Sequence, residues 1–124
     1  MGGESEAQNR RESDALPYAT RRTRVVALLA DERDRRVVDE ILGERVALYF
    51  CERSTELFRL ATDVRAHVVI ADSVDVDGMS TAPALHSLRA ALPLLQVVLY
   101  IDFSIRAVRS AIEGWATGVV FRHQ

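Results

Sequence analysis

The stretch "AHVVIAD", from Ala66 to Asp72, decides the fold prediction. Its residues His67 to Ala71 form a short apolar run, which is typical of a strand buried on both faces of a sheet. The run ends at a carboxylate, Asp72, and the loop that follows carries two more, Asp75 and Asp77. The stretch therefore predicts a buried strand with an acidic group at its carboxyl end.

The same apolar pattern returns along the chain in alternation with segments of helical spacing. Strands are predicted over residues 24–30, 45–50, 67–71, 95–101 and 118–121, and helices over residues 31–43, 54–61, 82–92 and 104–115. Such alternation predicts βαβ units, and hence a parallel sheet with helices on both faces. The carboxyl ends of parallel strands meet at one edge, so Asp31, Asp72 and Asp102 are expected there.

Composition excludes several classes of protein. The chain has 124 residues, of which 48% are hydrophobic, and its net charge of -2 offers no positive field for a nucleic acid. A single cysteine and three scattered histidines suggest neither a disulfide framework nor a zinc site. Without a secretory signal or an apolar run of membrane-spanning length, we expect a cytoplasmic protein that binds no membrane.

The domain boundary is predicted from a change in composition near residue 23. Residues 1–23 are polar, mix both signs of charge and show no hydrophobic period, so they are interpreted as a flexible N-terminal tail. Residues 24–124 carry all the predicted strands and helices. They are expected to form one domain.

Several motifs resemble the receiver domain of bacterial response regulators, the CheY-like branch of the flavodoxin-like α/β fold. They are "VVALLADERD", "HVVIAD", the Gly78-Met79 pair, "QVVLYID" and "AVRSAIEGWATGVVFR". The resemblance spans Arg24 to His123 and implies a five-stranded parallel sheet in the order 2-1-3-4-5. Receivers place a further helix after strand five, whereas this chain ends at "FRHQ", so the last helix is expected to be missing. One face of strands one and five should then expose apolar side chains for another segment or chain to cover.

The resemblance also implies a phosphorylation site. Asp72 matches the aspartate that accepts the phosphoryl group. Receivers bind Mg²⁺ through two adjacent acids after strand one, where this chain has Asp31, preceded by Ala30 and followed by Glu32 as a substitute. Since Mg²⁺ prefers carboxylate oxygens, the implied ligands are Asp31, Glu32 and Asp72. The carboxylate of Asp72 is expected within reach of Asp31 and partly exposed to solvent.

Three other positions depart from the receiver pattern. Ile101 stands where receivers have a hydroxyl that binds the phosphoryl group, Arg122 stands at the lysine position, and Val119 at the position of the switch aromatic. Isoleucine has no hydrogen-bond donor on its side chain, and an arginine has a longer, forked head than a lysine. These departures indicate a degenerate receiver, or pseudo-receiver.

We therefore expect a signalling module that acts through protein–protein interaction, independently of phosphorylation, and is not an enzyme. Its expected partner is another protein or a second copy of the chain. The alternative is the phosphoacceptor receiver of a two-component system, phosphorylated on Asp72 by a sensor histidine kinase, with Mg²⁺ as the only cofactor.

The acids at the sheet edge can also be explained by a simpler role, the capping of helices. Carboxylates near helix N-termini are stabilising in themselves, so Asp31, Asp72 and Asp102 can also be explained as helix caps. The charges from Arg33 to Glu40 are typical of a solvated helix face with paired signs.

Overall fold

The structure, a computed structural model of the chain, describes residues 22–101 and 116–121. Strands and helices alternate in these ranges: β1 (Arg24–Leu28), α3 (Glu32–Leu42), β2 (Ala47–Cys51), α4 (Ser54–Asp63), β3 (Val68–Ala71), α5 (Ala82–Ala91), β4 (Gln96–Ile101) and β5 (Gly118–Phe121). Every strand pair is parallel, and the order is β2-β1-β3-β4-β5. The predicted fold is confirmed.

Two expected segments lie wholly or largely outside the described residues. These are the helix over 104–115 and residues 1–21 of the predicted tail, so the domain boundary stays a prediction. In residues 22–101 and 116–121, no helix has the length and apolar character needed to cross a membrane.

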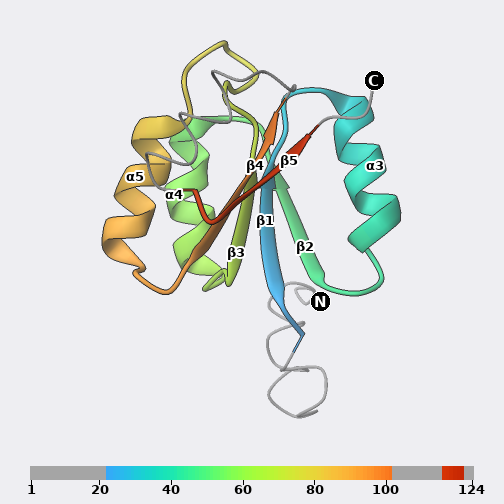
Figure 1. Cartoon of the computed structure of the whole chain (residues 1–124), viewed down its shortest axis with the longest axis horizontal. Coiled ribbons are helices and arrows are strands. Elements are labelled where there is room, and N and C mark those ends of the chain that lie inside the picture. Colours follow the sequence, from blue (N-terminus) through green and yellow to red (C-terminus); the bar gives the residue numbers. More distant parts are fainter. Residues whose placement is uncertain (1–21, 102–115, 122–124) are drawn as a thin grey trace.

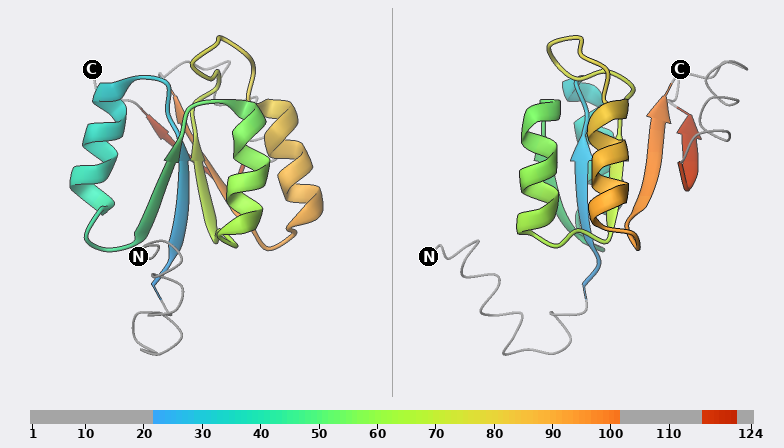
Figure 2. Two further views of the ribbon diagram at one scale, coloured as in Figure 1. Left: turned by 180° about the vertical axis from the view of Figure 1, so that it is seen from behind. Right: turned by 90° about the vertical axis from the view of Figure 1, so that its left-hand side faces the viewer.

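The helices form layers on the two faces of the sheet. α4 and α5 lie side by side on one face, and α3 lies on the opposite face (Figures 1 and 2). α3 is the only helix on its side within the described part of the chain. It lies over the β1–β2 part of the sheet, away from β5 (Figure 2).

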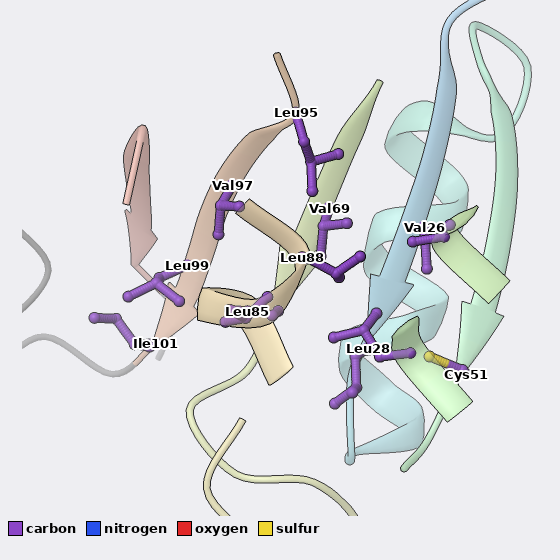
Figure 3. Close-up of a cluster of buried hydrophobic side chains, with 13 residues drawn as sticks. Val26, Leu28, Cys51, Val69, Leu85, Leu88, Leu95, Val97, Leu99 and Ile101 are labelled. Carbon is purple, nitrogen blue, oxygen red and sulfur yellow. The ribbon is translucent and has the colours of Figure 1, made fainter. Parts of the chain in front are cut away.

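The larger core lies between the sheet and the pair α4–α5. Alternate residues of the strands point into it, namely Val26 and Leu28 of β1, Val69 of β3, and Val97, Leu99 and Ile101 of β4 (Figure 3). They pack against Leu57 of α4 and against Leu85 and Leu88 of α5, which are fully buried. This two-residue period places one core on each face of the sheet.

The smaller core, on the α3 side, tests the expectation of exposed apolar side chains. The expectation is wrong for β1, because Val38 of α3 packs in one cluster with Ala27, which is fully buried. It is confirmed for β5, where Val120 is 46% exposed. Val120 pairs with Tyr100 of β4 and so lies on the α3 face.

Candidate functional site

Asp72 follows β3 at the carboxyl edge of the sheet, as predicted. Its N–H donates to the carbonyl of Leu28 at 2.9 Å, and its own carbonyl accepts the hydroxyl of Thr81 at 2.6 Å. The carboxylate Oδ1 accepts the N–H of Ser73 at 2.9 Å. We expected a partly exposed carboxylate, but Asp72 is buried, with 7% of its surface exposed. The loop over residues 73–81 contacts Asp72 through Ser73 and Thr81, and Thr81 is itself 1% exposed.

Asp31 is the N-cap of α3. Its Oδ1 accepts the N–H of Arg33 at 2.8 Å, and its Oδ2 lies 3.5 Å from the guanidinium of the same residue. The capping role proposed as the simpler alternative is therefore the one observed for Asp31. The neighbouring Glu32 points to solvent and pairs with Arg36 at 3.4 Å, four residues along the helix.

The structure does not bring Asp31, Glu32 and Asp72 together as a ligand set. Within residues 22–101 and 116–121, no three His, Cys, Asp or Glu side chains are grouped in a way that could hold a metal ion. Binding of Mg²⁺ by these three residues stays a prediction.

The residues directly after β1 are apolar. Leu29, fully buried in the smaller core, is next along the chain from Leu28, whose carbonyl binds the Asp72 N–H. The guanidinium of Arg35 donates to the carbonyls of Leu29 and Ala30, at 2.7 and 3.3 Å. The Arg35 guanidinium is therefore held against the backbone of the two residues that follow β1.

One acid of α3 was missed by sequence reasoning. Asp34 was assigned to a solvated face but is 6% exposed, so that expectation is wrong. Residues 34, 38 and 42 are spaced by four, which places Asp34 on the same helix face as Val38 and Leu42, toward the sheet. Because basic and acidic residues are mixed in "RDRRVVDE", the whole stretch was interpreted as one solvated face, and the spacing of Asp34 to Val38 and Leu42 was overlooked.

Two of the three substituted receiver positions lie in described residues. Ile101, at the end of β4, is 4% exposed and belongs to the larger core (Figure 3). Val119 of β5 is partly buried against the same core. Arg122 lies outside the described residues, so its place in the site stays a prediction.

Asp75 organises the loop that follows Asp72, a role that the sequence did not reveal. It is 4% exposed. Its Oδ1 accepts the N–H groups of Asp77 and Met79, both at 2.9 Å, and its Oδ2 accepts the N–H of Ser54, the first residue of α4, at 2.8 Å. These hydrogen bonds, that from Ser54 above all, hold the pKa of Asp75 below its usual value despite burial.

Further contacts bind the loop to the start of α4. The N–H of Val76 donates to the carbonyl of Glu52 at 3.0 Å, and the guanidinium of Arg53 lies 3.1 Å from the carboxylate of Asp77. Gly78 closes the turn at φ 80°, in the left-handed region that favours glycine. The loop is thus held at both its start and its tip.

A doubly wound sheet in the order 2-1-3-4-5, with a carboxylate after its third strand, has the fold of a response-regulator receiver domain. Solved structures similar to this chain include the response regulator TrrA from Thermotoga maritima in complex with Mg²⁺ and BeF, which is 19% identical over 82% of this chain and 87% of that one, with a TM-score of 0.69. The Vibrio cholerae chemotaxis protein CheY4 is 17% identical over 83% and 88%, with a TM-score of 0.71.

A third similar structure is the CheY-like protein TadZ from Pseudomonas aeruginosa, 20% identical over 80% of this chain and 86% of that chain, with a TM-score of 0.68. No family model matches the chain, and no curated protein matches it. At these identities the similarity defines the fold, and the function has to be argued from the residues of the site.

Proposed function

We propose that this chain is a receiver-like signalling module that acts through protein–protein contacts without phosphorylation, and that it is not an enzyme. The burial of Ile101 carries the proposal. Its side chain, 4% exposed, fills the position of the phosphoryl-binding hydroxyl with packed hydrocarbon, which has no hydrogen-bond donor. A phosphoryl group on Asp72 would lose that interaction.

Charge balance supports the same proposal. A phosphoryl group adds between about one and a half and two negative charges, which a metal ion or free cations must offset. Arg35 is already bound to two backbone carbonyls and lies 3.7 Å from the carboxylate of Glu52. Asp31 is committed to capping α3. Mg²⁺ bound through Asp31 would have to share a carboxylate that already caps α3.

Access to Asp72 is a third argument. The loop over residues 73–81 is fixed by the hydrogen bonds of Asp75 and by the hydroxyl of Thr81. Because Asp72 is 7% exposed, a phosphodonor would reach the carboxylate only after neighbouring residues moved. This constraint favours a module that keeps a single state.

The second candidate is a phosphoacceptor receiver, modified on Asp72 with Mg²⁺ by a sensor histidine kinase. It is favoured by the position of Asp72 at the end of β3. The fold similarity to TrrA, a response regulator solved with Mg²⁺ and BeF, points the same way.

The test is incubation of the full chain with acetyl phosphate and Mg²⁺, followed by intact-mass measurement. Asp72→Asn serves as the matched control, because it keeps the size of the side chain but removes the nucleophile. We expect neither protein to gain the mass of a phosphoryl group. Stoichiometric gain of one phosphoryl group by the wild type alone would favour the second candidate.

A further inference from the structure

One flank of α3 carries an exposed apolar pair. Val37 and Ile41 are 40% and 63% exposed, whereas Val38, one residue further on, belongs to the smaller core. The two exposed residues are four apart, so they lie on the same side of the helix, one turn from each other.

Opposite charges flank this pair. Arg33 stands four residues before Val37, and Glu44 stands three residues after Ile41. Gly43, the C-cap of α3, keeps a right-handed helical backbone, with φ -57° and ψ -28°, and Glu44 lies in the turn that follows it. The side chain of Arg33 is 84% exposed, and Glu44 is exposed. We call Arg33, Val37, Ile41 and Glu44 the α3 strip.

The α3 strip faces the open part of its layer. Arg35, on the other flank, reaches the carbonyl of Leu29 and the carboxylate of Glu52, just after β2. The α3 strip therefore points away from β2, toward the side where the described residues place no second helix (Figure 2). Val120 of β5, also exposed, lies on the same face of the sheet.

We propose that two copies of this chain associate through the α3 strip, with their α3 helices antiparallel about a two-fold axis. In this arrangement Val37 of each copy contacts Ile41 of the other, and Arg33 of each copy pairs with Glu44 of the other. Parallel helices would instead place Arg33 against Arg33 and Glu44 against Glu44. The charges of the strip therefore favour a second copy of the chain as the partner and an antiparallel orientation of the two α3 helices.

This inference rests on the proposed function, because it names the partner of the interaction module. Arg33 also lies 3.5 Å from Asp31, in an exposed ion pair of the kind that contributes little, so it can turn to a second copy. The strip is small, and the association is accordingly weak.

The test is sedimentation of the full chain over a concentration series, with two charge reversals. Arg33→Glu and Glu44→Arg should each weaken self-association by about tenfold or more, because each places like charges together. An equimolar mixture of the two variants should restore it, since every new acid then faces a new base. Arg59→Glu makes the same charge change as Arg33→Glu at an exposed position of α4. It is the matched control and should leave self-association unchanged.

Three outcomes would overturn the inference: a wild-type chain that stays monomeric at millimolar concentration, reversals that behave like Arg59→Glu, or a mixture that fails to associate. Circular dichroism of each variant establishes that it is folded. The series is repeated with Mg²⁺ and beryllofluoride. If the chain is monomeric with and without beryllofluoride, only the proposed dimer is wrong. If beryllofluoride changes the self-association, the proposed phosphorylation-independent function is wrong.

Discussion

The loop over residues 73–81 should depend on Asp75 more than on any other side chain. Asp75→Ala removes the acceptor of three backbone N–H groups, from Ser54, Asp77 and Met79. A hydrogen bond to a charged group contributes about 1.5–3 kcal/mol. Asp77 and Met79 are exposed, so water replaces much of what their N–H groups lose. We therefore expect the free energy of unfolding to fall by about 2–4 kcal/mol, most of it through Ser54.

The assay is urea denaturation, analysed as a two-state transition, with Asp77→Ala as the control. Asp77 makes an ion pair with Arg53 across 3.1 Å, but its side chain is 54% exposed, so its removal should cost about 0–1 kcal/mol. Asp75→Asn should fall between the two, because its amide nitrogen would face an N–H group on one side. Equal losses for Asp75→Ala and Asp77→Ala would refute the reasoning.

The same network predicts an acid limit of stability. The pKa of Asp75 is lowered in the folded state, mainly by the Ser54 N–H, so the unfolded chain binds the proton more tightly. Stability from this residue is complete above its unfolded pKa of about 3.9 and is lost as the pH falls through the lower folded value. Asp75→Ala should flatten this part of the curve of stability against pH.

Three further predictions concern single contacts. The pKa of His67 is lowered by burial and, to a smaller extent, by Arg24, whose backbone N–H donates to His67 Nδ1 at 2.9 Å. The free energy of unfolding should therefore fall as the pH drops below about 6.5. His67→Gln should remove this pH dependence, as measured by urea denaturation at a series of pH values. Thr81→Val breaks the 2.6 Å bond to the Asp72 carbonyl and should cost about 1–2 kcal/mol, also by urea denaturation. Burial and two nearby acids raise the pKa of Cys51 to about 12, so a thiol reagent at neutral pH should react only after unfolding.

The fold could be predicted from the sequence because the relevant signals are local. Apolar runs such as "HVVIA" have the length of buried strands, and helical spacing between them leaves parallel connections as the simplest solution. The end of β3 then fixed the position of Asp72 at the carboxyl edge.

The environment of Asp72 could not be predicted, because it depends on contacts between distant residues. The hydrogen bond from Ser54 to Asp75 joins residues 21 apart, and the bond from Thr81 to the Asp72 carbonyl joins residues nine apart. No sequence pattern predicts either hydrogen bond. Asp34 is different, since its spacing to Val38 and Leu42 already placed it on the buried face of α3.

The most direct test of the central claim is the response of the backbone amides of Ser73 and Thr81 to beryllofluoride and Mg²⁺, followed by NMR. Both residues contact Asp72, through its carboxylate and its carbonyl, so any phosphoryl mimic bound there would change their chemical shifts. We predict that adding the mimic leaves these shifts unchanged in the wild type, as it does in Asp72→Asn. A saturable change in the wild type that is missing from Asp72→Asn would contradict the claim and establish a working phosphoacceptor site.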